Sequence, residues 1–110
     1  MTKYRNKKLT TPDGSFDSQR EYKRWCELKL LQKAGKISQL QRQVKFELLP
    51  SQQRDDGTKE RPVAYILDFK YMDLEKGYYV YEDSKGMKTQ AWILKRKLML
   101  YIHGISVRET

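Results

Sequence analysis

The sequence predicts one α/β domain, with a mixed central sheet flanked by helices on both faces. A length of 110 residues leaves room for a single compact core, and 38% hydrophobic residues are enough to fill it. Segments with helical and with strand-like spacing of apolar residues follow one another in the order helix, strand, strand, strand, helix, strand. This order is typical of a sheet that helices cover.

The N-terminal segment differs in character from the rest of the chain. It contains Pro12, Gly14 and a set of basic residues, with little apolar periodicity. We expect residues 1–16 to form a basic arm, flexible or loosely docked, that lies along phosphates. Residues 17–110 then form the single folded domain.

The first helix is predicted to follow this arm. Asp17 or Ser18 provides its side-chain cap, and Gly35 ends it. Glu21 follows Ser18 at the spacing of a capping box. Apolar residues recur at helical spacing toward the core, at Tyr22, Trp25, Leu28, and Leu31 or Ala34.

Three strands come next in the chain. Residues 43–49 alternate apolar and polar side chains up to Pro50, as in a half-buried strand. The polar stretch 51–62 is interpreted as a loop or a hairpin tip. Residues 63–74 and 78–86 are two tyrosine-rich strands, and the "EKG" between them has the length and chemistry of a tight hairpin turn.

A second helix is predicted within residues 88–104. Thr89 can cap its beginning, and Gly104 ends it. The apolar side chains of this segment, from Trp92 onward, recur at helical spacing. The "ISV" of residues 105–107 is then a short final strand.

The charge of the chain indicates its partner. Lys and Arg number 23 against 14 Asp and Glu, which leaves a net charge of +9 and favours polyanions. Nucleic acid is therefore the expected partner, and a basic structural piece of a larger complex is the alternative. No run is apolar enough to cross a bilayer or to act as a signal peptide, so we expect a cytoplasmic protein without a membrane partner.

The composition also limits the cofactors. One cysteine, Cys26, and one histidine, His103, cannot make a zinc cluster of the usual kind, so any metal must be held by oxygen ligands. The chain has neither a P-loop nor a glycine-rich dinucleotide fingerprint. We therefore expect no small-molecule cofactor.

The most informative residues end the two tyrosine-rich strands. Alternation puts Asp83 and Lys85 on one face and Glu82 and Ser84 on the other, and antiparallel pairing can bring Asp68 opposite or diagonal to Asp83. Two carboxylates at close range repel each other unless a positive charge lies between them. Oxygen donors select Mg²⁺ or Mn²⁺, to which the backbone carbonyl of Ser84 can add a ligand. The alternative is that these are solvated strand residues and a surface ion pair.

The whole pattern resembles the PD-(D/E)XK superfamily, the restriction-endonuclease-like fold. The element order matches its αβββαβ core, "ILDF" stands where its first acidic residue lies, and "EDSK" stands where its (D/E)XK signature lies. More narrowly, the run from "FDSQREYKRW" through "YILDFKY" and "YEDSKGMKT" to "LKRKLML" looks like a family of small phage and prophage nucleases described as Holliday-junction-resolvase-like. One departure is Leu67, where the superfamily often has a proline before Asp68.

The resemblance implies a Mg²⁺-dependent DNA endonuclease of a phage or prophage, working in a bacterial host on branched or structured DNA, and a homodimer. By this resemblance Asp68 and Asp83 bind the metal, and Lys85 positions or deprotonates the attacking water. Glu21 completes the site from the first helix, or else serves only as half of the capping box. The rival function is a nucleic-acid-binding module or partner subunit that keeps the nuclease fold without turnover.

A second set of residues is a candidate for DNA contact. It contains basic and polar side chains around the second helix and one glutamine before the first long strand, namely Lys88, Thr89, Lys95, Arg96 and Gln43. The alternative is that they form an ordinary solvated surface.

Overall fold

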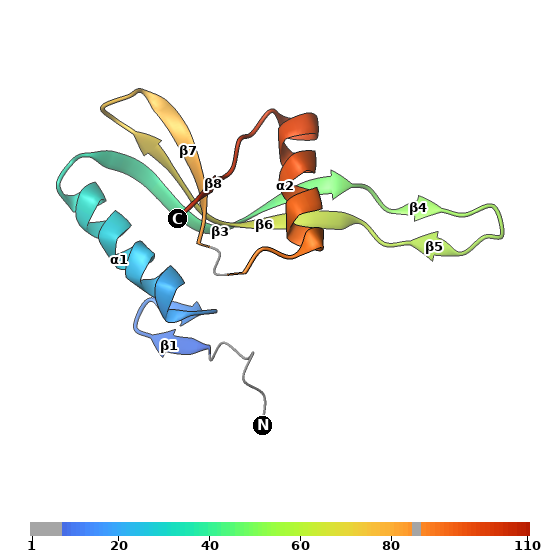
Figure 1. The fold of residues 1–110 in the computed structure, drawn as a ribbon, viewed down its shortest axis with the longest axis horizontal. Coiled ribbons are helices and arrows are strands. Elements are labelled where there is room, and N and C mark those ends of the chain that lie inside the picture. Colours follow the sequence, from blue (N-terminus) through green and yellow to red (C-terminus); the bar gives the residue numbers. More distant parts are fainter. Residues whose placement is uncertain (1–7, 85–86) are drawn as a thin grey trace.

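The computed structural model of the protein describes residues 8–84 and 87–110. The described residues form ten elements: β1 (Leu9–Thr11), β2 (Gly14–Phe16), α1 (Gln19–Lys33), β3 (Ile37–Leu49), β4 (Gln52–Gln53), β5 (Lys59–Glu60), β6 (Val63–Asp73), β7 (Tyr78–Asp83), α2 (Gln90–His103) and β8 (Arg108–Glu109). The central sheet has the strand order β3-β6-β7-β8, antiparallel except for the parallel pair β7-β8. The predicted mixed α/β fold with two helices is confirmed (Figure 1). None of the described helices has the length and apolar character needed to cross a membrane.

Both helices begin and end at the residues that capping chemistry predicts. The Ser18 hydroxyl accepts a hydrogen bond from the Glu21 backbone N–H, and the Thr89 hydroxyl accepts one from the Trp92 backbone N–H. Gly35 and Gly104 have left-handed backbones with φ of 79° and 69°. Such a conformation costs glycine little, so each glycine ends its helix cleanly.

Strand β3 is longer than the sequence predicts. It begins at Ile37 rather than at residue 43, and its inward positions include Ser38 and Arg42. Apolar residues usually fill such inward positions. Because Ser38 and Arg42 are polar, this half of the strand lacks the alternation of apolar and polar residues by which a strand is predicted.

The two predicted tyrosine-rich strands form the expected hairpin. Asp73 pairs with Tyr78, and the Asp73 carboxylate accepts hydrogen bonds from the backbone N–H groups of Glu75 and Lys76 in the turn. At the opposite end of β6, β4 and β5 pair as the tip of a ribbon that projects beyond the body of the molecule (Figure 1). Residues 51–62 are therefore a hairpin tip, one of the two forms expected.

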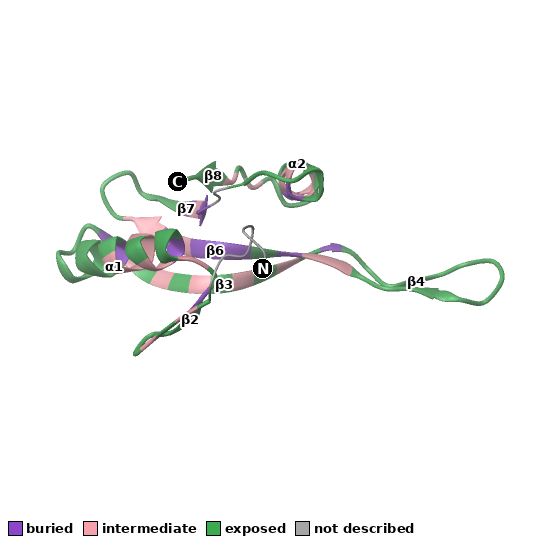
Figure 2. Ribbon diagram, turned by 60° about the horizontal axis from the view of Figure 1, so that its bottom comes forward, coloured by how far each residue is buried: buried purple, intermediate pink, exposed green. Residues whose placement is uncertain are grey.

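Each helix packs against one half of β6. Leu28 of α1 belongs to a buried cluster with Phe69 and Tyr71, and Trp92 of α2 belongs to a second cluster with Tyr65. Figure 2 shows β6 as the most continuously buried strand of the sheet. The two helices thus divide β6 along its length, and the residues between the clusters include Asp68.

Two terminal segments differ from expectation. Of the expected arm over residues 1–16, the described part from residue 8 onward contains the β1–β2 hairpin, with Phe16 only 1% exposed. Phe16 packs against Tyr22 and Trp25 of α1, so its burial orders this segment. The last strand is Arg108–Glu109 and not 105–107, because Ile105 and Val107 pack on the α2 cluster instead.

A buried ion pair joins α1 to β7. The guanidinium of Arg24 donates two hydrogen bonds to the carboxylate of Glu82, at 2.8 and 2.7 Å, and the Tyr71 hydroxyl donates a third. Glu82 is 2% exposed, so its charge depends on these partners. The carboxylate in turn raises the pKa of Arg24.

Arg24→Met should lower the free energy of unfolding by about 2–3 kcal/mol, because it leaves the Glu82 carboxylate buried without its cation. The measurement is chemical denaturation, with unfolding monitored by circular dichroism. The double variant Arg24→Met/Glu82→Gln should recover a large part of the loss, since a neutral amide needs no cation. A double variant as unstable as the single one would contradict the assignment.

Candidate functional site

The candidate site lies where β6 and β7 leave their regular pairing. The last regular pair is Phe69 with Glu82, so the register continues to Asp68 opposite Asp83. Here each side chain bonds to the backbone of the other strand. The Asp68 N–H donates to Asp83 Oδ1 at 3.0 Å, and the Ser84 N–H donates to Asp68 Oδ2 at 2.9 Å. The two aspartates are neighbours, as antiparallel pairing predicts.

Asp83 is fully buried and its carboxylate faces inward. Its Oδ2 accepts a hydrogen bond from the Tyr65 hydroxyl and another, at 2.9 Å, from the Trp92 indole N–H. The donor groups come from β6 and α2, so the carboxylate fastens the start of α2 to the sheet. Burial, followed by the hydrogen bond to Asp83, raises the pKa of Tyr65 above its ordinary range.

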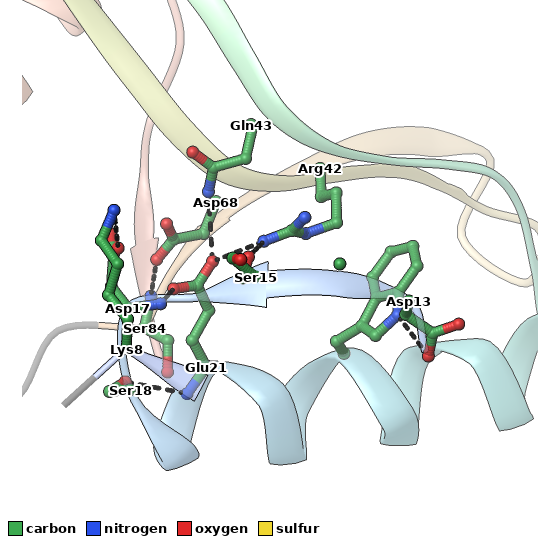
Figure 3. A network of polar contacts seen from close by, with 12 residues as sticks. Lys8, Asp13, Ser15, Asp17, Ser18, Glu21, Arg42, Gln43, Asp68 and Ser84 are labelled. Atoms are coloured by element: carbon green, nitrogen blue, oxygen red, sulfur yellow. Dashed lines mark hydrogen bonds and ion pairs between the residues drawn. The ribbon is translucent and has the colours of Figure 1, made fainter. Parts of the chain in front are cut away.

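Glu21 lies on the α1 side of the site, buried to 3% exposure. Its Oε1 accepts from the backbone N–H of Asp17 at 3.2 Å, and its Oε2 accepts from Gln43 Nε2 at 3.1 Å with Arg42 Nη2 3.5 Å away. Burial raises the pKa of Glu21. In Figure 3 the Glu21 and Asp68 side chains point into the same region. One oxygen of Glu21 therefore bonds at the start of α1, and the other faces Gln43 and Arg42 of β3.

Glu82 takes no part in this arrangement. It points toward α1 and Arg24, and β7 pairs with β6 without a register shift. Glu82 could lie on the same side of β7 as Asp83 only if the strand contained a β-bulge, and the β6–β7 pairing contains none.

A small polar hollow lies next to Glu21. It has a volume of about 140 Å³ and is lined by two basic, two acidic and two neutral polar residues, namely Lys8, Arg42, Asp17, Glu21, Ser15 and Gln43. Because Ser15 and Lys8 line it, the N-terminal hairpin forms one wall. The segment expected to lie along phosphates therefore contributes directly to the surroundings of the site.

Four of the predicted DNA-contact residues lie within α2 or directly before it, whereas Gln43 lies on β3. Lys88 Nζ lies 2.8 Å from the Glu109 carboxylate and Arg96 lies 3.4 Å from it, so both basic groups are paired with one acid. Lys95 and Thr89 instead line a hollow of about 270 Å³ together with Ile66 and Trp92. Gln43 bonds to Glu21 as described above. Lys85 lies outside the described residues.

The donor set can be compared with what a metal needs. Among residues 8–84 and 87–110 no three His, Cys, Asp or Glu side chains form a group that could hold a metal ion. Mg²⁺, however, is commonly held by one or two carboxylates, with water and substrate phosphate in the remaining positions. Asp68, Asp83 and the Ser84 carbonyl supply oxygen donors only, so their chemistry fits a hard divalent ion.

Sequence reasoning missed the groups that hold these acids. In the sequence Trp92 is predicted only as an apolar residue of the second helix, and neither Tyr65 nor Arg42 is predicted as a partner of these acids. A buried tyrosine hydroxyl and a buried indole N–H each need an acceptor, and this signal is available from sequence once burial is expected. The spacing of Tyr65 and Trp92 along the chain does not point to Asp83 as that acceptor.

A family model, DUF1064, described as a protein of unknown function, matches residues 1–108. No curated protein and no solved structure matches the chain.

The raised pKa values of Tyr65 and Tyr71 predict a pH dependence of stability. Burial and a neighbouring carboxylate raise each pKa above the ordinary value of 10.0, so both stay neutral in the folded protein when an unfolded chain would ionise them. Their contribution to stability is complete below pH 10.0 and is lost as the pH rises above it.

Tyrosinate absorbance should therefore reveal tyrosines that ionise only when the circular dichroism signal is lost. The double variant Tyr65→Phe/Tyr71→Phe should show two fewer such tyrosines. Early ionisation of both residues in a protein that remains folded would contradict the burial of their hydroxyl groups.

Proposed function

The chain belongs to the DUF1064 family, and we propose that it is a Mg²⁺-dependent endonuclease that hydrolyses phosphodiester bonds in DNA. The observation that carries the proposal is a pair of hydrogen bonds at adjacent strand ends, in which Asp83 accepts from the Asp68 backbone and Asp68 accepts from the Ser84 backbone. Asp83 and Asp68 are 0% and 6% exposed, so two buried carboxylates lie on neighbouring strand ends where water solvates them poorly. A cation between them offsets a cost that the fold would otherwise bear.

The partners of the two acids support this proposal. Among the described residues, the groups that bond Asp83 are neutral donors, namely a hydroxyl, an indole N–H and a backbone N–H. Glu82, one residue earlier, is instead neutralised by Arg24. The contrast between these neighbours is expected if the charge near Asp83 is left for a metal ion.

Asp68, Asp83 and the Ser84 carbonyl would hold the ion, and Glu21 would complete the site from the α1 side. When bound, a hard divalent cation polarises the scissile phosphate and lowers the pKa of a water molecule. Lys85 is assigned from the sequence resemblance to offset the charge that develops at the phosphorus. Asp83 keeps its orientation through Tyr65 and Trp92.

The remaining parts of the proposal concern the substrate. A net charge of +9 favours DNA, and Lys95 at the hollow beside Trp92 is a candidate contact with the phosphate backbone. Branched or structured DNA, a phage or prophage origin, action inside the bacterial host and a homodimer follow from the sequence resemblance to PD-(D/E)XK resolvase-like nucleases. We propose them on that ground alone.

The direct test is cleavage of a labelled four-way junction, a flap, a linear duplex and single-stranded DNA, each with Mg²⁺, Mn²⁺ or chelator. The wild type should cut at least one of these DNAs only when a divalent ion is present. Asp68→Asn should reduce the rate by about a thousandfold or more, because it removes a charge from the metal site while the amide oxygen can still accept from Ser84.

Asp73→Asn is the matched control. It makes the same chemical change in β6, and Asp73 also accepts backbone hydrogen bonds, but at the far end of the strand. This variant should cut like the wild type. Salt-sensitive DNA binding without cleavage under any divalent ion would instead favour the rival function of a binding module.

A separate prediction concerns Lys85. Lys85→Ala should lower the maximal rate by about a hundredfold or more while the Mg²⁺ concentration for half-maximal activity stays nearly constant, because the lysine is assigned to the phosphate and the water rather than to the metal. Cleavage rates over a series of Mg²⁺ concentrations separate the two effects. Full activity in this variant would remove Lys85 from the site.

A further inference from the structure

Two non-glycine residues of β3 have left-handed backbones, Gln39 and Gln43, both with φ of 57°. Residues other than glycine, asparagine and aspartate seldom adopt this conformation, and it costs free energy. At Gln39 the pairing explains it. Ser38 pairs with Met72 and Gln41 pairs with Lys70, so the strand carries an extra residue there and forms a bulge.

The pairing does not explain Gln43. Arg42 pairs with Phe69 and Val44 pairs with Leu67, so the register is unbroken and Gln43 lies directly across from Asp68. No extra residue has to be accommodated at this point. The register therefore does not account for the backbone at Gln43, and the contact that distinguishes this residue is its side-chain hydrogen bond.

The side chain of Gln43 bonds to Glu21. Its Nε2 donates to Glu21 Oε2 at 3.1 Å, on the oxygen that Arg42 Nη2 approaches to 3.5 Å (Figure 3). Arg42 is itself held by the Ser15 carbonyl at 2.8 Å and by the Phe16 ring, whose centroid is 3.8 Å from its Cζ. The backbone of Gln43 thus lies opposite Asp68, and its side chain bonds to the carboxylate of Glu21.

We propose that Gln43 is a positioning residue, whose left-handed backbone aims its amide at Glu21 and so fixes that carboxylate beside Asp68. This inference rests on the proposed nuclease function. It replaces the expectation that Gln43 contacts DNA. A carboxylate held by one amide and one guanidinium has a defined direction, whereas the flexible glutamate side chain alone has several rotamers.

The experiment compares Gln43→Gly with Gln43→Ala. Both variants lose the amide, but glycine adopts a φ near 57° without the Cβ penalty. Gln43→Gly should therefore melt at a higher temperature than Gln43→Ala. Both should cut more slowly than the wild type, by about tenfold or more, with an unchanged KM for whichever of the four DNAs the wild type cuts. Both should also bind Mn²⁺ more weakly, as measured by electron paramagnetic resonance without DNA.

Gln39→Gly is the matched control, because it relieves the same backbone conformation at a residue whose side chain bonds to Tyr79 instead. It should keep the wild-type rate and Mn²⁺ affinity. Gln43 variants that cut and bind Mn²⁺ like an active wild type would overturn the positioning role alone. A wild type that neither cuts any of the four DNAs nor binds Mn²⁺ would overturn the proposed function, and this inference with it.

Discussion

The arrangement of the site depends on two hydrogen bonds across the ends of β6 and β7, from the Asp68 N–H to Asp83 and from the Ser84 N–H to Asp68. Each carboxylate takes a backbone N–H of the opposite strand at the point where the β6–β7 pairing ends. The same Asp83 carboxylate accepts from Tyr65 and Trp92, so the position of α2 is tied to this pair. Because both acids are buried, any change in one of them alters the solvation of the other.

Two consecutive acidic residues of β7, Glu82 and Asp83, are buried with different kinds of partner. Glu82 points toward α1 and is neutralised by Arg24, whereas Asp83 points toward α2 and is bonded by neutral donors. An ion pair of this kind stabilises a fold only when its geometry is good, and here it is bidentate. The alternation of a single strand therefore directs one buried acid to an ion pair with α1 and the next to hydrogen bonds with β6 and α2.

Sequence predicted what depends on local chemistry. Caps at Ser18 and Thr89 and the pairing of the two strand-end aspartates follow from residue type and spacing, and the structure contains them. The sequence did not predict contacts between segments that are distant in the chain. Arg42 packs on Phe16 of the N-terminal hairpin and approaches Glu21 of α1, both of which are distant from it in the chain. Left-handed backbone at a glutamine has no sequence signal at all, since the residue type disfavours it.

The most direct test of a cation between the two aspartates is the anomalous scattering of Mn²⁺ in crystals of the protein. Our account predicts a single strong peak about 2.1 Å from oxygens of both Asp68 and Asp83, at the usual distance for a hard divalent ion. The peak should disappear in crystals of Asp68→Asn grown under the same conditions. A site without a peak at saturating Mn²⁺, or a peak only at surface acids such as Glu109, would contradict the assignment.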